Sequence, residues 1–121
     1  MSYIPINIEE KFSRFSEAYS PKVIAEMNDY QFKLVRTVGE FTWHAHPDTD
    51  EVFIVIDGIL DIEFRDGKVA LSAGEMFVIP KGVEHRPVAH KECKIMLVEP
   101  KDVVNTGDAG GKLTAKNDVW V

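Results

Sequence analysis

The sequence lacks the cysteine pairs that would link it to an oxidising compartment. It contains a single cysteine, Cys93, in 121 residues, so no internal disulfide can form. Cys93 lies in the alternating apolar run ECKIMLVE, where a buried structural thiol is the expected role, and it has no neighbour in sequence that would activate it as a nucleophile. We therefore expect a reduced thiol and a cytoplasmic location.

Long apolar runs and clusters of basic residues are also missing. The longest apolar run, residues 52–56, is far shorter than the roughly 20 residues that span a bilayer. The N-terminal residues carry acids and a proline in place of the basic and apolar regions of a signal peptide. The net charge of -6 argues against binding to a phosphate backbone. We expect neither a membrane nor a nucleic acid as partner.

What the sequence does contain is a series of short β-strand patterns within one domain, residues 1–121. From Pro21 onward, runs rich in Val, Ile, Phe and Thr are interrupted by Gly, Asp or Asn, which is typical of a β-sandwich or a barrel. We expect strands near residues 22–27, 31–38, 41–46, 51–57, 59–65, 67–71, 75–79, 85–90 and 93–99. The fold class is therefore all-β, with a barrel core over about residues 22–99.

The two ends of the chain depart from the strand pattern. Ile8, Phe12 and Phe15 are spaced as one face of a short amphipathic helix over residues 8–18, with Asn7 as N-cap and Glu10 in the capping-box position. Residues 100–121 are rich in glycine and small polar residues, which predicts an irregular segment. Its apolar end, residues 119–121, is expected to dock on its own or a neighbouring subunit.

Turn residues and alternation predict how the strands connect and which side chains they bury. The dipeptides Asp57-Gly58 and Asp66-Gly67 are typical of tight hairpins. Six apolar residues alternate along the predicted strands and are expected in the core. These core residues are Phe53, Val55, Ile62, Phe64, Met76 and Val78.

A pair of histidines one residue apart is the main chemical signal. On a strand, residues i and i+2 share a face, so the imidazoles of His44 and His46 project together. Glu51 begins the next predicted strand, and His85 follows a Pro-Lys-Gly turn and begins a later one. If the two hairpins face each other in a closed barrel, these four residues form a three-histidine, one-carboxylate site for a first-row divalent metal.

Several neighbouring residues offer alternative roles. Asp48 and Asp50 could replace Glu51 as the acidic ligand, although both lie in a predicted turn. Lys81 and Arg86 flank His85 and could bind an anionic substrate, as could Arg36, but charged residues beside turns are most often solvated. His90 lies apart from this arrangement and is expected to be an ordinary polar residue.

The positions of these residues resemble the two conserved motifs of the cupin superfamily. The first motif is matched by Gly39, His44, His46, Glu51 and Gly58, and the second by Gly74, Pro80, Gly82 and His85. The gap between Gly39 and His44 is one residue shorter than usual, and Ala89 stands where the motif has asparagine. Neither departure affects a ligand position, and the four glycines are expected to form turns at the barrel corners.

The resemblance implies a fold, a metal site and a range of activities. The implied fold is a small double-stranded β-helix, a jelly roll, in a chain that commonly forms a homodimer. The implied metal is Fe, Mn, Zn or Ni, held by His44, His46, Glu51 and His85. Small cupins of this kind include proteins described as mannose-6-phosphate isomerase-like as well as dioxygenases, so the substrate is expected to be a small molecule.

Two functional hypotheses follow from the predicted site. In the first, the protein is a metal-dependent enzyme, either an isomerase or lyase or a dioxygenase, in which Glu51 could also serve as a base. In the second, it is a non-enzymatic cupin that binds or senses a metal or small molecule. The absence of a DNA-binding helix pattern makes a regulatory role of this chain on its own the weaker alternative.

Overall fold

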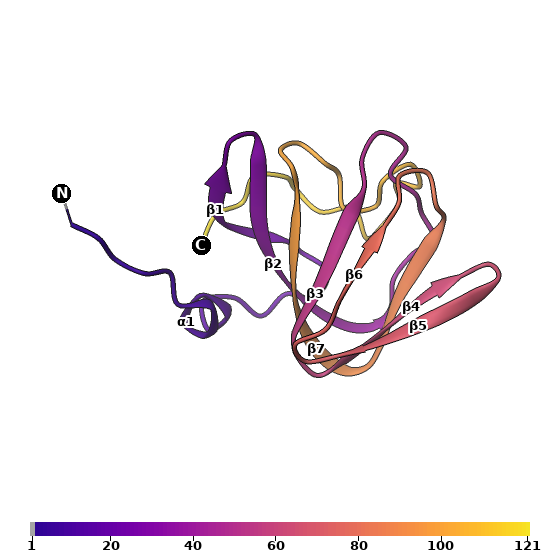
Figure 1. The fold of residues 1–121 in the computed structure, drawn as a ribbon, viewed down its shortest axis with the longest axis horizontal. Coiled ribbons are helices and arrows are strands. Elements are labelled where there is room, and N and C mark those ends of the chain that lie inside the picture. The colour runs from indigo at the N-terminus through magenta and orange to yellow at the C-terminus, as the bar shows by residue number, and fades with distance from the viewer. Residues whose placement is uncertain (1) are drawn as a thin grey trace.

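The computed structural model describes residues 2–121, which form one short helix and seven strands (Figure 1). The helix, α1, spans Ile8–Phe12. The strands are β1 (Lys22–Met27), β2 (Tyr30–Glu40), β3 (Glu51–Asp57), β4 (Ile59–Phe64), β5 (Gly67–Ser72), β6 (Met76–Ile79) and β7 (His85–Pro100). The predicted all-β class with a short N-terminal helix is confirmed.

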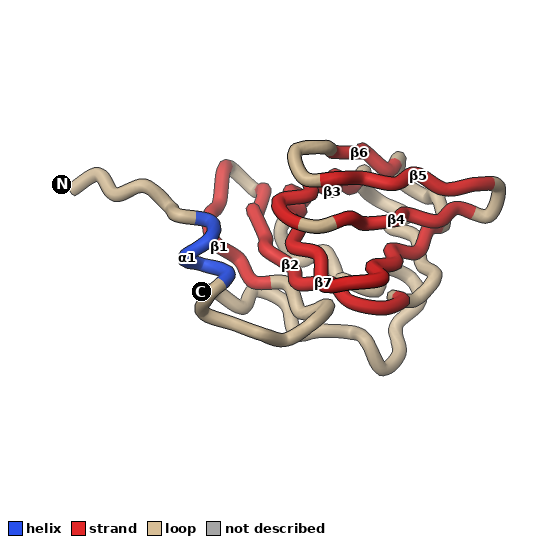
Figure 2. The backbone as a smooth tube through the Cα atoms, turned by 90° about the horizontal axis from the view of Figure 1, so that it is seen from below, coloured by secondary structure: helices blue, strands red, loops and turns tan. Residues whose placement is uncertain are grey.

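The long strand β7 joins two parts of the sheet into a jelly roll. One part has the strand order β1-β2-β7-β3-β6, and β4 pairs with β5 and with β7. Residues 85–88 of β7 pair with β4, whereas its later residues pair with β2 and β3, all in antiparallel register. Because one strand serves both parts, the strands curve around a shared interior, as Figure 2 shows.

The interior is filled by side chains from opposing strands. In register, Val35 faces Ile95 and Phe53 faces Leu97, and all four are buried. Leu60 and Ile62 of β4, with Leu71 of β5, complete this core. The core lies beside the metal-ligand candidates, so the packing of β2, β3, β4 and β7 also holds the site rigidly.

A second apolar cluster lies on the outer side of the sheet, beneath α1. Phe12 and Phe15 pack there with Ile24 and Leu34. The N-cap is the predicted one, since the Asn7 Oδ1 atom accepts a hydrogen bond from the Glu10 amide at 2.9 Å. The helix ends at Phe12, earlier than the predicted residue 18.

Arg36 explains the early end of the helix. Its guanidinium donates to the backbone carbonyls of Phe12 at 2.7 Å and Phe15 at 2.8 Å. Carbonyls at the C-terminal end of a helix lack partners within the helix, so a side-chain donor satisfies them while the chain turns away. Phe15 is still buried, as the helical spacing predicted.

Three predicted connections differ from the structure. Residues 41–46 do not form a strand and contribute a single β-bridge at His44, whereas the predicted strands 85–90 and 93–99 are one strand, β7. Asp57-Gly58 makes a corner and not a hairpin, because β3 and β4 do not pair with each other: β3 pairs with β6 and β7, and β4 pairs with β5 and with another part of β7. Gly58 has a φ of 93°, and a Cβ there would lie 3.0 Å from the Glu92 carbonyl oxygen, which explains the glycine.

The predicted core residues divide into two groups. Phe53, Val55 and Ile62 are buried and Phe64 is half-buried, as expected. Met76 and Val78 are exposed, because Phe77 and Ile79 are the residues of β6 that face inward. When the inward positions of a strand are assigned one residue off, every side chain is placed on the wrong face. Because all four residues of β6 are apolar, alternation could not decide which of them face the core.

The segment after Pro100 crosses one end of the barrel and returns to β1. The Asp108 amide donates to the Ala45 carbonyl at 3.0 Å, and the Ala45 amide donates to Asp108 Oδ1 at 2.9 Å. Further along, the Val23 amide donates to the Val119 carbonyl at 2.7 Å. The C-terminus thus lies beside α1 (Figure 2), and no helix in residues 2–121 is long and apolar enough to cross a membrane.

Candidate metal site

A single β-bridge brings two of the candidate ligands together. The His44 amide donates to the His85 carbonyl at 3.0 Å, and the His85 amide donates to the His44 carbonyl at 2.9 Å. This reciprocal pair joins the loop of residues 41–50 to the first residue of β7. The two imidazole centroids lie 4.3 Å apart, so the predicted opposition of the two hairpins is present in the structure.

The loop that carries His46 is held against the turn before His85. The His46 carbonyl accepts a hydrogen bond from the Gly82 amide at 2.9 Å, and the Asp50 Oδ1 atom accepts one from the Lys81 amide at 2.8 Å. Asp50 therefore serves this turn, and Asp48 is exposed beside it. Of the three acids considered from the sequence, the structure groups only Glu51 with the histidines.

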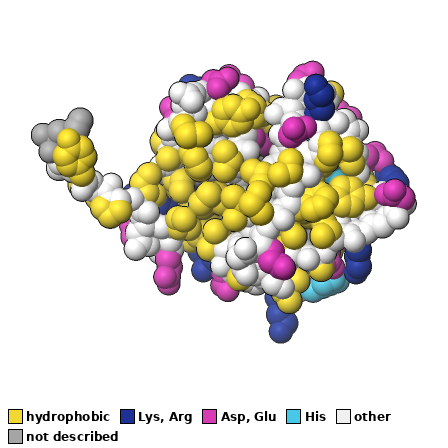
Figure 3. All heavy atoms as spheres, viewed as in Figure 1, with side chains coloured by type: hydrophobic (Ala, Val, Ile, Leu, Met, Phe, Trp, Pro, Cys, Tyr) yellow, Lys and Arg dark blue, Asp and Glu magenta, His cyan; other side chains and the backbone are white. Residues whose placement is uncertain are grey.

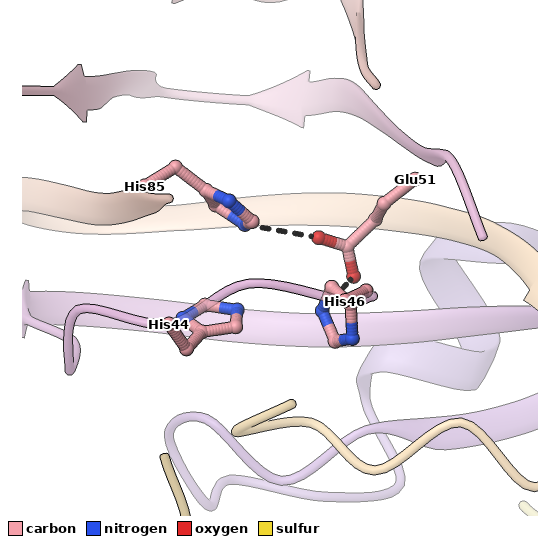
Figure 4. A group of neighbouring side chains, drawn as sticks. All are labelled: His44, His46, Glu51 and His85. Atoms are coloured by element: carbon pink, nitrogen blue, oxygen red, sulfur yellow. Dashed lines mark hydrogen bonds and ion pairs between the residues drawn. The ribbon is translucent and has the colours of Figure 1, made fainter. Parts of the chain in front are cut away.

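All four predicted ligands converge in the interior (Figure 4). His44, His46, Glu51 and His85 are buried, and one candidate ligand atom from each lies within 4.8 Å of the others. The Glu51 carboxylate lies between two imidazoles, with Oε2 3.2 Å from His46 Nε2 and Oε1 3.2 Å from His85 Nε2. Ligand atoms that share one ion at about 2.1 Å are separated by roughly 3 to 4 Å, which matches this spacing.

The hydrogen bonds of the rings direct their free lone pairs into the cluster. His44 Nδ1 donates to the Thr42 carbonyl and His85 Nδ1 donates to the Val83 carbonyl, each at 2.9 Å. In neutral imidazole the other nitrogen, Nε2, is then an acceptor. The His46 Nε2 atom is buried without a well-aligned hydrogen bond, although Glu51 is close. The Nε2 lone pairs and the Glu51 carboxylate oxygens are acceptors that face one another in a buried space, and such atoms require a proton or a cation between them. This arrangement supports the binding of a metal ion.

The ionisation states suit a metal site. Burial, with a smaller effect of His85, lowers the pKa of His44 to about 4, so His44 is neutral at pH 7. Burial disfavours the charged form of Glu51, but the adjacent rings of His46 and His85 outweigh it and hold the pKa of Glu51 below its usual range. For His46, burial is likewise outweighed by Glu51, and its pKa is raised.

Two spaces of different size adjoin the cluster. The inner one, of about 30 Å³, is lined mainly by apolar side chains, including Phe41 and Phe53, together with His44 and Glu51. This space is large enough for one or two water molecules but not for an organic substrate. The outer one, of about 410 Å³, is a groove with His46 in its wall. Its other lining residues are Pro47, Asp48, Thr49, Pro100, Lys101, Asp102, Val103, Val104, Gly107 and Asp108.

The cationic residues considered as anion ligands line neither space. Arg86 donates to Glu63 Oε1 at 2.6 Å, and Arg36 donates to the carbonyls near α1. Lys81 is exposed and lines neither space. His90 is on the surface, 3.4 Å from Asp61, apart from the ligand cluster as expected.

Sequence reasoning missed a buried ion pair close to the site. Lys33 Nζ lies 2.9 Å from Glu99 Oε1, and both side chains are buried. Burial and the nearby charge of Glu51 raise the pKa of Glu99 to about 7. The signal was available, because Lys33 and Glu99 occupy inward positions of two alternating strands.

Sequence reasoning also missed that residues 106–108 of the C-terminal segment cover the site. A Cβ added to Gly107 would lie 2.3 Å from the Ala45 carbonyl oxygen and 3.2 Å from His44 Cδ2. The close approach of residues 106–108 to the loop of residues 41–50, which carries His44 and His46, therefore depends on this glycine. Its presence in a glycine-rich run was visible in the sequence, but nothing in the run indicated what it would contact.

Comparison with known proteins agrees with this geometry. The sequence profile described as Cupin domain matches residues 35–99, the segment that holds all four candidate ligands. This chain belongs to the cupin family. A cupin-2 domain protein from Shewanella frigidimarina has a solved structure that is 66% identical, with a TM-score of 0.79 over 79% of this chain and 94% of that one.

Two further relatives are more distant in sequence. The structure of protein NMB1881 from Neisseria meningitidis is 31% identical, with a TM-score of 0.74 over 81% of this chain and 100% of that one. The uncharacterized protein YdbB of Bacillus subtilis is 38% identical over 103 residues, which cover 76% of this chain and 85% of YdbB. The family resemblance expected from the two motifs is thus confirmed.

Proposed function

We propose that this cupin is a metal-dependent enzyme that acts on a small organic molecule. The observation that carries the proposal is the convergence of three imidazoles and one carboxylate with buried, facing acceptor atoms. Such a set suits Fe, Mn, Zn or Ni and leaves coordination positions open. When bound, the ion would supply Lewis-acid chemistry, or redox chemistry if it is Fe, Mn or Ni.

The residues of the chain have separate roles in this proposal. His44, His46, Glu51 and His85 hold the ion, and the carbonyls of Thr42 and Val83 fix the orientation of two of the rings. The apolar side chains around the inner space exclude bulk water from that side. A base role for Glu51 stays a prediction, and its lowered pKa favours the role of ligand because a weakly basic carboxylate accepts a proton poorly.

The groove supports a neutral or cationic substrate over an anionic one. Asp48, Asp102 and Asp108 line it together with one cation, Lys101. A phosphate or carboxylate entering this groove would meet more negative than positive charge, and the arginines that could compensate are engaged elsewhere. The charge of the groove therefore makes a sugar phosphate the less favoured substrate within the isomerase branch.

Metal analysis tests the proposal directly. Elemental analysis of the untagged wild-type protein should find about one transition metal per chain. The double variant His44→Ala/His46→Ala should lose it, whereas His90→Ala, which changes an exposed histidine away from the cluster, should retain it. Iron would direct the search to oxygen-uptake assays, and zinc to isomerase and lyase assays. A wild-type protein that takes up no metal after reloading would refute the proposal.

A non-enzymatic binding module is the alternative, and the small inner space favours it. With residues 103–108 in place, the inner space is too small for an organic molecule, and the groove beside His46 is the larger of the two spaces at the site. A metal-loaded protein that binds small molecules without turning any of them over would support a sensing or storage role. Metal-dependent turnover of one compound would exclude it.

A further inference from the structure

Residues 103–117, which we call the strap, line both spaces at the candidate metal site. In Figure 1 they belong to the yellow end of the chain, which crosses the barrel before the C-terminus returns to β1. Asn105 lines the inner space. The strap residues that line the groove are Val103, Val104, Gly107 and Asp108. The strap therefore separates the two spaces, and lifting it would make them continuous.

The strap lacks the apolar contacts that hold other segments in place. Hydrophobic side chains gather over the sheet on the face shown in Figure 3, and α1 packs on the sheet through Phe12 and Phe15. By contrast, neither hydrophobic cluster of the described residues contains a residue of the strap. Thr106 is the one buried residue within 103–117, a range that the structure describes completely. A segment with few buried apolar contacts opens at a lower free energy than the whole barrel.

In the described chain, hydrogen bonds join the strap to the barrel at only a few points. Asp108 and Ala45 exchange two of them, at 3.0 and 2.9 Å. We call this reciprocal pair the latch. The others run from the Asn105 side-chain amide to the Tyr19 carbonyl at 3.2 Å and from Lys33 Nζ to the Val103 carbonyl at 3.5 Å. Each is a polar contact that water replaces at small net cost when the strap lifts.

The strap is also bonded to itself, so it can move as one unit. Asn105 Nδ2 donates to the Leu113 carbonyl at 2.9 Å, and Asn105 Oδ1 accepts from the Ala115 amide at 2.8 Å. The hydroxyls of Thr106 and Thr114 share a hydrogen bond of 2.7 Å. These bonds tie the first part of the strap to its last part, and none of them needs to break when the strap leaves the barrel.

Both ends of the strap are anchored, with a hinge position beside each anchor. Before the strap, the Lys101 amide donates to a carbonyl of the turn between β1 and β2 at 2.8 Å. After it, the Val119 carbonyl accepts from an amide of β1 at 2.7 Å. Asp102 has a φ of 73° and Asp118 a φ of 58°, left-handed values that aspartate adopts at a modest cost. Rotation at these two residues would swing the strap while both anchors stay in place.

We propose that the strap is a lid, and that its opening admits an organic molecule to the metal ligands. This inference rests on the proposed function, because it concerns access to the same site. In the closed state the inner space of about 30 Å³ has room for one or two water molecules. In the open state it joins the groove of about 410 Å³, and the rings of His44 and His85 become accessible. Closure then excludes bulk water from the ligands.

Chemical modification of the full chain after removal of metal tests the lid. Diethyl pyrocarbonate is a small neutral reagent that acylates accessible imidazoles, so its reaction with the buried His44 and His85 requires an opening. His90, with a side chain that is 82% exposed, reacts without any opening. Cys93 is buried in the main core, so its reaction with iodoacetamide reports unfolding of the barrel. Mass spectrometry gives each rate relative to that of the same group in an unstructured peptide.

Two variants separate release of the latch from loss of charge. Asp108→Ala removes the acceptor of the Ala45 amide and should raise the rates at His44 and His85 about fivefold, as expected for one lost hydrogen bond, with Cys93 unchanged. Asp48→Ala is the matched control, because it removes a carboxylate from the same groove and leaves the latch intact. Its rates should equal those of the wild type.

In the wild-type protein, His44 and His85 should react more slowly than His90 and faster than Cys93. Rates at His44 and His85 that match Cys93 would refute the lid, because the ligands would then open only when the barrel unfolds. Rates that match His90 would show that nothing covers them, and a folded Asp108→Ala with unchanged rates would also refute the lid. If Asp108→Ala unfolds, Cys93 reports it and the wild-type comparison decides. A protein that takes up no metal would refute the proposed function without affecting these rates.

Discussion

At the scale of single residues, the site depends on which nitrogen of each imidazole carries a proton. Two backbone carbonyls select the tautomers of His44 and His85, and Glu51 lies between the remaining lone pairs. Sequence spacing identified all four side chains that the structure groups. Alternation was enough to place Glu99 on an inward position, but not to show its proximity to Glu51 and Lys33, which lie on other strands.

We predict that metal affinity falls as the pH is lowered. A metal requires neutral imidazoles, and Glu51 raises the pKa of His46, so a proton competes with the metal at His46 at a higher pH than at an ordinary histidine. Metal affinity therefore falls as the pH falls, because more of the imidazole is protonated and the metal must displace each bound proton. Calorimetric titration with Zn²⁺ should show an affinity several-fold lower at about pH 6 than at about pH 8. An affinity independent of pH over this range would contradict the assignment of His46 as a ligand.

At the scale of elements, the structure depends on contacts that local pattern does not reveal. Residues 41–46 alternate as a strand would, yet they form a β-bridge only at His44, because Ala45 bonds to Asp108 and the His46 carbonyl accepts from the Gly82 amide. Asp57-Gly58 has the composition of a hairpin turn but forms a corner, since β3 and β4 do not pair with each other. Local composition predicts that a turn forms, and the pairing of distant strands decides which turn it is.

We expect Gly107→Ala to disturb the cover of the site. The added Cβ would overlap the Ala45 carbonyl, and the positive φ of 55° adds backbone strain. The free energy of unfolding should fall by about 1 to 3 kcal/mol, and Zn²⁺ affinity should fall with it. Gly110→Ala is the control, because its φ of 64° is similar but nothing lies within 4 Å of the added Cβ. Equal effects of the two substitutions in urea unfolding would show that only backbone strain matters.

The buried pair of Lys33 on β2 and Glu99 on β7 gives a second prediction for the elements. Glu99→Leu leaves the Lys33 ammonium buried without its partner and should lower the free energy of unfolding by about 3 to 5 kcal/mol. In the double variant Lys33→Met/Glu99→Leu both charges are replaced, and stability should return to within about 1 to 2 kcal/mol of the wild type. Urea unfolding of metal-free protein measures both. A double variant as unstable as Glu99→Leu would contradict this explanation.

At the scale of the whole molecule, the proposed metal would link segments that are distant in sequence. The four ligands come from the loop of residues 41–50, the first residue of β3 and the first residue of β7. An ion bound to all of them stabilises the closed jelly roll only when these segments are together, so binding and folding are coupled. Cytoplasmic location stays a prediction at this scale.

Removal of the metal should therefore lower thermal stability. At a free metal concentration about 100-fold above the dissociation constant, binding contributes about 2.7 kcal/mol, which corresponds to roughly 10 °C in Tm for a chain of this size. Calorimetric scans with saturating Zn²⁺ and with EDTA measure the difference. The variant His44→Ala/His46→Ala should have the same Tm in both conditions. A wild-type protein with an unchanged Tm would count against metal binding.

Residue type and short spacing were enough to predict the β-rich class, the turns between many of the strands and the identity of the four grouped side chains. The tertiary structure alone decided that Met76 and Val78 face outward, that His44 and His85 form one bridge, and that residues 106–108 cover the ligand loop. These features arise from pairing between segments distant in sequence. A strand pattern with apolar residues on both faces is compatible with either orientation until its neighbours are in place.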